Sequence, residues 1–472
     1  MEPKIINRRD FLIKSAVGVG ACTILPAYLT SARAADNPKL PPSQRVNLAC
    51  IGIGGRAFQV IPHLCSKNIS TPVAFADVDF ECGKKIIEQF PKVKTYHDFR
   101  KMFDEMGKDI DAVSIITPDH THFVATILAM SMGKHVYTEK PLTHTFEEAE
   151  ILMRAEKKYG VVTQMGNQGH TSSGAMQFKQ LVAEGIVRDI VKIEAWKDAS
   201  LWFMNGKKRI AKFPEQESLP TSLQNWDLWC GPREVKAFSN KYHPFDWRGF
   251  YCYGGGMFGD WGSHLIDFAH DYLHMGLPTE VKAMKCVDHN KFIFPQSSHI
   301  VFKFPERGPG LPAVELDWKA GNDFEPPQAS PKYAEPNSEG ILQIPNLGEA
   351  GTFLHRQQDD YLIQRGHHGD ISRIYPRKTM LEFGAKMKVA NPPLNHQGSF
   401  IQACKGQGKT ESPFHRAGVL TQVLNIGTIA EQLNQDLTFN PQTKLFGNSD
   451  MANALLRGPE PRTEWAQYYK LA

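Results

Sequence analysis

The sequence predicts an α/β protein with an N-terminal doubly wound parallel sheet and a C-terminal α+β domain whose open sheet is largely antiparallel. Two observations support this fold class. Between residues 46 and 165, short apolar runs of strand length alternate with helical stretches, and a glycine cluster follows the first run. From residue 166 on, strand-like runs are separated by long loops rich in Pro and Gly. The 472 residues are enough for both domains.

The first 34 residues predict an export signal. Arg8-Arg9 precedes a weakly apolar stretch from Ser15 to Leu29, which is a twin-arginine pattern. Ala32-Arg33-Ala34 fits a small-x-small cleavage site, so we expect a periplasmic protein that begins at Ala35. Lipidation at Cys22 is the alternative. The twin-arginine route exports folded proteins, so a cofactor could be bound before export.

Composition excludes several classes of protein. Hydrophobic residues make up 41% and charged residues 22%, which is typical of a globular protein. The net charge is +4, and most of it lies in residues 1–34, which hold five basic and two acidic residues. We therefore expect no nucleic-acid partner and no membrane span. The eight cysteines include no C-x-x-C pair, so the sequence predicts neither a metal site nor a disulfide framework.

The first domain is expected to span residues 35–165. Its predicted strands lie near 46–51, 73–77, 111–116, 134–138 and 161–165, and predicted helices include Phe123–Met132 and Phe146–Tyr159. Thr145 followed by Glu148 matches a capping box at the start of the second of these helices.

A glycine-rich turn follows the first strand. Gly52, Gly54 and Ala57 give the G-x-G-x-x-A spacing of a Rossmann dinucleotide-binding turn, which also contains Gly55 and Arg56. The small residues permit a tight turn and a close approach of backbone N–H groups to a pyrophosphate. Asp77 ends the second strand, where a carboxylate accepts hydrogen bonds from a ribose. An acid at this position favours NAD over NADP.

The second domain is expected to span residues 166–472. A helix over 174–184 leads to a strand at Ile190–Trp196, and further strands are expected near 281–287, 299–304 and 313–318. The stretch 305–350 predicts a long excursion over the surface or over a partner subunit, and residues 396–434 predict helix.

Residues 134–141, KHVYTEKP, end the fourth predicted strand with Glu139-Lys140-Pro141. Together with the glycine turn and the Thr117-Pro118 loop, this motif resembles the Gfo/Idh/MocA (glucose–fructose oxidoreductase / inositol dehydrogenase) family, in its twin-arginine-exported branch. The resemblance implies an often cis Lys-Pro peptide and a Lys140 side chain between nicotinamide and substrate. It also implies further contacts with the cofactor from Thr117, Pro118, His122, Glu139 and Asn167.

A second motif, residues 254–267, resembles the glycine-rich turn of the same family that leads into a helix. Asp260 and His264 are one helical turn apart and share a face. An isolated pair of this kind is otherwise a surface pair or a fragment of a metal site. With Lys140 upstream, we expect His264 to act as general base, Asp260 to assist it, and Lys140 to stabilise a developing alkoxide. Asp267 follows three residues after His264.

The remaining expected substrate residues are His170, Trp247 and Arg248, beside Asp260 and His264. Arg248 is either a clamp for substrate hydroxyl or carboxylate groups or part of a structural ion pair. Trp226 and Trp229 are either core residues or stacking surfaces for a sugar.

The resemblance implies an exported oxidoreductase that holds NAD tightly, acts on a secondary hydroxyl of a sugar, glycoside or polyol, and forms a homo-oligomer. Two alternatives stay open. One is a redox-neutral NAD-dependent glycosidase, in which transient oxidation permits elimination. The other is a sugar-binding protein without activity on the same fold. The sequence does not identify the substrate.

Overall fold

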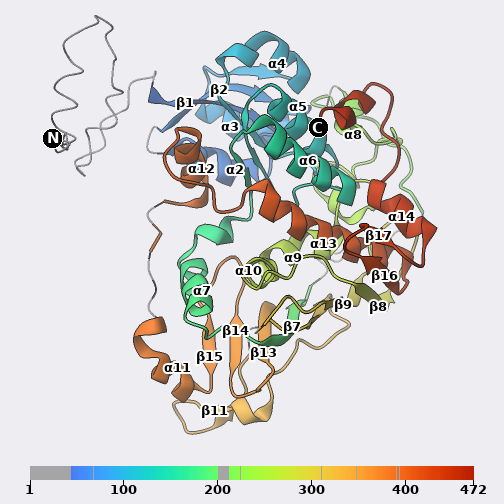
Figure 1. The fold of residues 1–472 in the computed structure, drawn as a ribbon. Helices are drawn as coiled ribbons and strands as arrows, with labels where there is room; N and C mark the ends of the chain where they lie inside the picture. Colours follow the sequence, from blue (N-terminus) through green and yellow to red (C-terminus); the bar gives the residue numbers. More distant parts are fainter. Residues whose placement is uncertain are drawn as a thin grey trace, which may run out of the picture. The chain divides into compact units, whose positions relative to one another are not determined.

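A computed structural model describes residues 44–472, except for 67–68, 200–211, 224, 310, 347, 388, 390 and 393. The described residues belong to one compact unit that contains a six-stranded and a nine-stranded sheet (Figure 1). The predicted export signal, with Cys22 and the cleavage site, lies outside the described residues. Within the described part of the chain, no helix is both long and apolar enough to cross a membrane.

The six-stranded sheet is parallel throughout, in the order β3-β2-β1-β4-β5-β6. Its strands are β1 (Val46–Ile51), β2 (Ser70–Ala76), β3 (Lys94–Tyr96), β4 (Ala112–Ile115), β5 (His135–Thr138) and β6 (Thr163–Met165). The strand order reverses between β1 and β4, where doubly wound sheets bind ligands. This confirms the predicted parallel sheet. The sequence did not predict β3, which is three residues long and begins with the exposed Lys94.

Helices cover both faces of this sheet, so the alternate side chains of β1 enter two separate cores. Leu48 and Cys50 pack with α2 (Ala57–Leu64) and α12 (His396–Cys404), whereas Ala49 and Ile51 pack with α5 (Asp119–Ser131) and α6 (Phe146–Tyr159). The helices of this part are α2 (Ala57–Leu64), α3 (Phe80–Gln89), α4 (Phe99–Met106), α5 (Asp119–Ser131) and α6 (Phe146–Tyr159). Burial on both faces explains why these strands read as continuous apolar runs.

Local signals explain how two of these helices begin. In α6, Thr145 accepts a hydrogen bond from the Glu148 backbone, and the Glu148 side chain accepts one from the Thr145 backbone, which confirms the predicted capping box. The α5 helix begins at Asp119, four residues before the predicted start, with Pro118 as its N-cap. Residues 119–122 are polar yet buried, so hydrophobic periodicity did not reveal them.

The second sheet has nine strands in the order β15-β14-β13-β7-β10-β9-β8-β16-β17. Only β7 and β10 pair in parallel, so the predicted, largely antiparallel sheet is confirmed. The strands are β7 (Ile190–Lys197), β8 (Glu280–Val287), β9 (Ser297–Phe304), β10 (Val314–Ala320), β13 (Ala350–Arg356), β14 (Leu362–Arg365), β15 (Arg373–Tyr375), β16 (Leu437–Asn440) and β17 (Leu445–Phe446). The excursion between β10 and β13 contains a small hairpin, β11 (Glu335–Pro336) and β12 (Leu342–Gln343).

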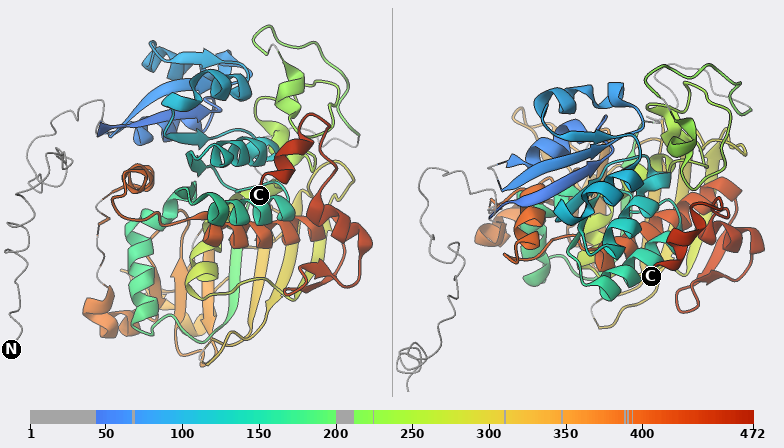
Figure 2. Two further views of the ribbon diagram at one scale, coloured as in Figure 1. Left: turned by 45° about the horizontal axis from the view of Figure 1, so that its top comes forward. Right: turned by 90° about the horizontal axis from the view of Figure 1, so that it is seen from above.

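Helix α13 joins the two halves. It packs against α6 of the first half and against α9 and β8 of the second, and Figure 2 shows it lying along one face of the large sheet. The helices here are α7 (Ser173–Ala183), α8 (Trp226–Cys230), α9 (Gly256–Leu265), α10 (Asp267–Tyr272), α11 (Arg377–Phe383), α12 (His396–Cys404), α13 (Phe414–Leu433) and α14 (Asp450–Arg457). Short 3-10 helices are η4 (Gly107–Asp109), η5 (Gln168–Thr171), η6 (Asp246–Gly249), η7 (Pro331–Tyr333), η8 (Gly384–Met387) and η9 (Ala466–Lys470).

The helix predicted over residues 396–434 is two helices. The chain between α12 and α13 passes through Gly406 and Gly408, which have φ angles of 72° and 89°. Pro413 then caps α13. A left-handed backbone cannot continue a right-handed helix, so α12 and α13 are separate.

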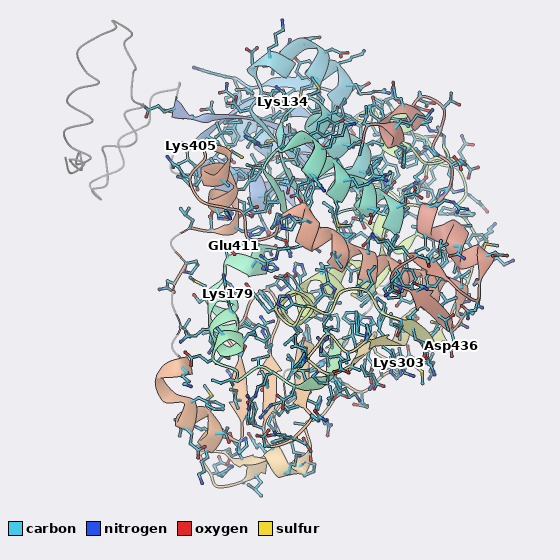
Figure 3. All side chains as sticks on the ribbon, in the orientation of Figure 1. Lys134, Lys179, Lys303, Lys405, Glu411 and Asp436 are labelled. Carbon is cyan, nitrogen blue, oxygen red and sulfur yellow. The ribbon has the colours of Figure 1, made fainter. Side chains whose placement is uncertain are left out.

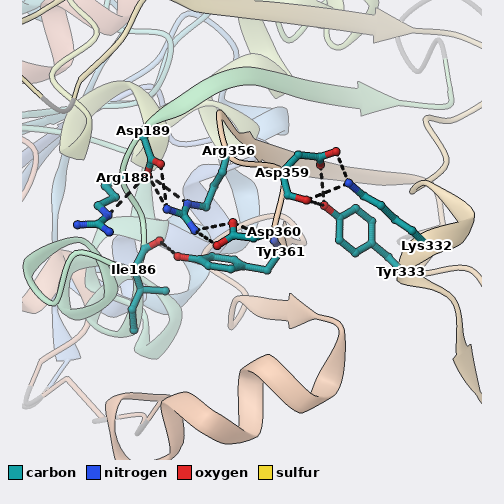
Figure 4. A network of polar contacts seen from close by, with 9 residues as sticks. All are labelled: Ile186, Arg188, Asp189, Lys332, Tyr333, Arg356, Asp359, Asp360 and Tyr361. Atoms are coloured by element: carbon teal, nitrogen blue, oxygen red, sulfur yellow. Dashed lines mark hydrogen bonds and ion pairs between the residues drawn. The ribbon is translucent and has the colours of Figure 1, made fainter.

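Ion pairs fix the far end of β13. The Arg356 guanidinium contacts Asp189, at the start of β7, at 2.9 Å and Asp360 at 2.6 Å, and the Tyr361 hydroxyl donates to the Ile186 carbonyl at 2.7 Å (Figure 4). By contrast, charged side chains such as Lys179 and Lys303 project from the surface (Figure 3). The Arg356 cluster therefore ties the β13–β14 connection to the segment between α7 and β7.

Candidate active site

A cavity of about 920 Å³ lies at the carboxyl ends of β1, β2, β4 and β5, with α9 as another wall. Most of the predicted site residues line it: Gly52, Gly54, Gly55, Arg56, Asp77, Thr117, Pro118, His122, Glu139, Lys140, Trp247, Arg248, Asp260 and His264. The parallel sheet places the ends of these strands at one edge, so residues far apart in sequence share one cavity.

The glycine turn leaves room for a ligand at the start of α2. Gly52 has a φ of 78°, and a Cβ there would lie 2.6 Å from the Ile116 carbonyl oxygen. Gly55 has a φ of 53°, and a Cβ there would meet no atom within 4 Å. Ala57, the first residue of α2, is fully buried and does not line the cavity. The backbone of this turn fits a pyrophosphate at the helix N-terminus.

Asp77 lies at the end of β2 with its carboxylate fixed. One of its oxygens accepts a hydrogen bond from the Ile53 N–H at 2.8 Å, and the other accepts one from the Asp79 N–H at 3.0 Å. Burial raises the pKa of Asp77, and these two hydrogen bonds oppose the rise. The position fits the predicted contact with the ribose of a dinucleotide.

Glu139 is buried beside the glycine turn. Its carboxylate lies 3.7 Å from the Arg56 guanidinium and accepts a hydrogen bond from the Tyr137 hydroxyl at 3.4 Å. Gly166 leaves the space that the carboxylate fills, because a Cβ at that position would lie 2.6 Å from it. Burial raises the pKa of Glu139, and the charge of Arg56 opposes this effect.

Lys140 and Asp260 form an ion pair across the cavity, between the end of β5 and helix α9. The Lys140–Pro141 peptide is cis, as the resemblance implied. Asp260 and His264 lie on α9 as predicted, and the Asp260 carboxylate contacts the Lys140 ammonium. Asp260 is therefore positioned to hold Lys140, and its predicted assistance to His264 stays a prediction.

His264 lies next to a second histidine that sequence reasoning missed. The rings of His264 and His368 are 4.0 Å apart, and His367 Nδ1 lies 2.6 Å from His368 Nδ1. Burial lowers the pKa of His264 well below its usual value, and the positive charge of Lys140 adds to this effect. A ring that is neutral at neutral pH can accept a proton.

Asp119 is a further carboxylic acid in the cavity. It begins α5, is 7% exposed, and accepts a hydrogen bond from the Gly255 N–H at 3.1 Å. Burial raises its pKa to about 7, although the charges of Arg248 and Lys140 oppose the rise. Asp119 therefore titrates in the neutral range beside the Lys140–Asp260 pair.

His122 links the two loops that carry Thr117 and Lys140. Its Nε2 lies 2.8 Å from the Thr117 carbonyl oxygen, and its Nδ1 lies 2.8 Å from the Pro141 carbonyl oxygen. Burial lowers the pKa of His122 to about 4, so the ring is neutral at neutral pH and donates to only one of these carbonyls at a time.

Two models of known protein families match the chain, and both agree with this geometry. Residues 46–167 match the NAD-binding Rossmann fold of the Gfo/Idh/MocA oxidoreductase family, and residues 172–290 match its C-terminal alpha/beta domain. The chain belongs to the Gfo/Idh/MocA family. Residues 46–167 are accordingly an NAD-binding Rossmann domain.

Curated relatives match only parts of the chain. The scyllo-inositol 2-dehydrogenase (NADP(+)) IolW of Bacillus subtilis is 30% identical over 107 residues, which is 23% of this chain and 29% of the relative. The levoglucosan dehydrogenase of Pseudarthrobacter phenanthrenivorans is 24% identical over 235 residues, which is 48% of this chain and 50% of the relative. The chain thus spans half or less of the length of these relatives.

Solved structures show the same fold. The WlbA dehydrogenase from Chromobacterium violaceum, in complex with NADH and UDP-GlcNAcA, has a TM-score of 0.55 and 14% identity over 84% of this chain and 96% of the other. At this identity the likeness concerns the fold alone.

Besides Ala57, two predicted site residues of this Gfo/Idh/MocA chain, Asn167 and His170, do not line the cavity. Asn167 donates a hydrogen bond to one oxygen of Asp267 at 2.7 Å, and His170 Nε2 lies 2.9 Å from the other. Helix α9 ends at Leu265, and Asp267 begins α10, so Asp267 does not continue the face that carries Asp260 and His264. The three buried side chains form a cluster next to the cavity.

Trp226, Trp229 and Trp247 are all buried, and whether any of them stacks on a sugar stays a prediction. Trp226 and Trp229 stack on each other with centroids 4.4 Å apart in a buried aromatic cluster. Trp229 and Trp247 also line the cavity. The Arg248 guanidinium lies over the Trp247 ring at 4.2 Å.

Sequence reasoning missed several cavity residues. Asp119 directly follows Pro118, and Gln168 directly follows Asn167, so their position next to predicted site residues was the available signal. No local sequence pattern identifies Cys82, His243 and His368 as site residues, because they enter the cavity from segments that only tertiary folding brings together.

Proposed function

We propose that this protein is an NAD-dependent oxidoreductase that oxidises a secondary hydroxyl of a sugar, glycoside or related polyol, or catalyses this oxidation reversibly. The observation that carries the proposal is the meeting of Lys140, Asp260 and His264 in the cavity that also contains the glycine turn and Asp77. The dehydrogenase names of the relatives give further support.

The charge of each residue suits a different role in the proposed reaction. When bound, the nicotinamide would supply the hydride acceptor, at its C4 atom. The neutral His264 would accept the hydroxyl proton, and the Lys140 ammonium would stabilise the negative charge that develops on the substrate oxygen. Asp260 would hold the Lys140 ammonium in place through their ion pair. The remaining cofactor contacts would come from the glycine turn, Arg56, Glu139 and the Thr117–Pro118 loop.

Asp77 supports NAD as the cofactor. A carboxylate at the ribose accepts hydrogen bonds from a free 2′-hydroxyl and repels a 2′-phosphate. One relative carries NADP(+) in its name, so the preference has to be measured on this chain.

The test identifies the bound cofactor and then the product. Native mass spectrometry of the purified protein should show NAD, and a panel of glycosides and inositols should yield a ketone product with reduced nicotinamide. Sugar release without net reduction of the cofactor would favour the redox-neutral glycosidase. A protein that binds sugars but leaves the nicotinamide oxidised with every substrate would contradict the proposal and favour the inactive sugar-binding protein.

Export and assembly are part of the proposal. Arg8-Arg9 and the Ala32-Arg33-Ala34 site support a periplasmic location reached by the twin-arginine route. Changing Arg8 and Arg9 to Lys should trap the protein in the cytoplasm, and unchanged export would refute the assignment. We also propose a homo-oligomer, which light scattering of the purified protein would test. A monomeric mass would refute it.

A further inference from the structure

Three side chains with metal-binding atoms meet beside the cavity. Asp79 caps the N-terminus of α3, Cys82 lies in the first turn of that helix, and His243 comes from the segment between α8 and η6. Cys82 and His243 line the cavity, and Asp79 is buried. The histidine is separated by more than 160 positions from the other two, so no sequence spacing reveals the cluster.

The distances between Asp79 Oδ2, Cys82 Sγ and His243 Nε2 are close to those between the ligand atoms of a tetrahedral zinc site. His243 Nε2 lies 2.9 Å from Asp79 Oδ2, Cys82 Sγ lies 3.5 Å from the same oxygen, and Cys82 Sγ lies 3.6 Å from His243 Nε2. In a tetrahedral site with Zn–S of about 2.3 Å and Zn–N and Zn–O of about 2.0 Å, sulfur would lie roughly 3.5 Å from each lighter atom. Nitrogen and oxygen would lie roughly 3.3 Å apart in that site, so a shift of about 0.4 Å between them would complete the geometry.

The local charge favours a cation. Asp77 lies beside the cluster, and its carboxylate accepts a hydrogen bond from the Asp79 N–H. Among the described residues, neither Asp77 nor Asp79 forms an ion pair with a lysine or an arginine. A zinc ion bound at this cluster would take the place of the Cys82 thiol proton.

We propose that Asp79, Cys82 and His243 bind one zinc ion, with the fourth position left to a water molecule. The ligand set of one thiolate, one imidazole and one carboxylate suits zinc and its closest substitute, cobalt. The ion would join α3 of the Rossmann domain to the segment that carries Phe245, Trp247 and Arg248. It would thereby fasten one wall of the cavity. The site does not depend on the proposed oxidoreductase function.

The rival explanation is a simple ion pair between Asp79 and His243, with Cys82 as a neighbour. Burial raises the pKa of Asp79, but hydrogen bonds from His243 and Ser222 outweigh burial and bring it to about 2. An ion pair of this kind needs no thiol. The role of Cys82 therefore separates the two explanations.

The test measures metal binding by the full-length protein after treatment with a chelator. Calorimetry with zinc chloride should show one zinc site per chain, with Cys82 among its ligands. Cys82→Ser should weaken zinc binding by more than the 10- to 100-fold that loss of an outer-shell partner typically costs. Cys65→Ser is the matched control, because Cys65 is also partly buried but lies at the end of α2. Its zinc affinity should equal that of the wild type.

The absorption spectrum of bound cobalt is a second measurement, and a folding defect in a variant cannot produce its thiolate signal. Cobalt bound to a thiolate shows a near-ultraviolet charge-transfer absorption, which should be present in the wild type and in Cys65→Ser and absent in Cys82→Ser. Circular dichroism checks that each variant is folded. The proposal is overturned if the wild type binds no zinc, if Cys82→Ser binds zinc as tightly as the wild type, or if bound cobalt lacks the thiolate absorption.

Discussion

Replacing Asp119 with Asn should stabilise the protein in a pH-dependent way. The folded state raises the pKa of Asp119 from 3.8 to about 7. Over that interval the folded chain holds a proton that the unfolded chain has lost, so the stability of the wild type falls as the pH rises from about 4 to about 7. At about 1.4 kcal/mol for each pKa unit, the loss is about 4 kcal/mol.

Asn carries no such proton and can still accept the hydrogen bond from the Gly255 N–H. The free energy of unfolding of Asp119→Asn, relative to the wild type, should therefore increase by about 4 kcal/mol between pH 4 and pH 8. Urea titrations of the cofactor-free protein across this range measure it. Asp109→Asn, at an exposed carboxylate, is the control and should show no comparable trend. A difference between Asp119→Asn and the wild type that stays constant with pH would refute the assigned burial cost.

Three further predictions concern the turn, a buried ion pair and the ribose site. Gly52→Ala should abolish retention of the cofactor and destabilise the fold by about 2 kcal/mol or more, because its Cβ would overlap the Ile116 carbonyl. Gly55→Ala introduces the same backbone strain without the overlap and should retain the cofactor. Equal cofactor content of the two variants, by mass spectrometry, would contradict this reading. Arg233→Met should cost about 3–5 kcal/mol in urea unfolding, because Glu148 is 1% exposed and would lose its cation at 2.9 Å; a loss under about 1 kcal/mol would count against it. Calorimetry on stripped protein should show NAD binding more tightly than NADP, with the preference reduced at least tenfold in Asp77→Ala, on the order of 1.4 kcal/mol. Tighter or equal binding of NADP by the wild type would refute the role of Asp77.

Local sequence signals predicted the first half of the fold well. The capping box at Thr145 gave α6 with its observed bounds, and the glycine turn placed the start of α2. Strands with buried polar residues were harder to predict. In β13 and β14, Thr352, Arg356 and Gln364 are buried among apolar neighbours, which removes the alternation that identifies a strand.

Local sequence signals likewise predicted only part of the candidate site. Lys140, Asp260 and His264 lie in short motifs, and the parallel sheet brings those motifs to one cavity. The partner of Asp260 was not predicted, because it depends on the position of the Lys140 side chain across the cavity. His368 and His243 reach the cavity from loops of the second half, and only tertiary structure brings them there.

Single-turnover reduction of the bound nicotinamide tests the central claim most directly. With a responsive glycoside, Lys140→Met and His264→Ala should each slow the near-ultraviolet absorbance change by about 100-fold or more, because both residues act on the oxygen that loses its proton. Both variants should retain the cofactor, and the double variant should lose much less than the product of the single losses. Near-wild-type rates in both single variants, with folding and cofactor content intact, would contradict the assignment of these residues to the chemistry.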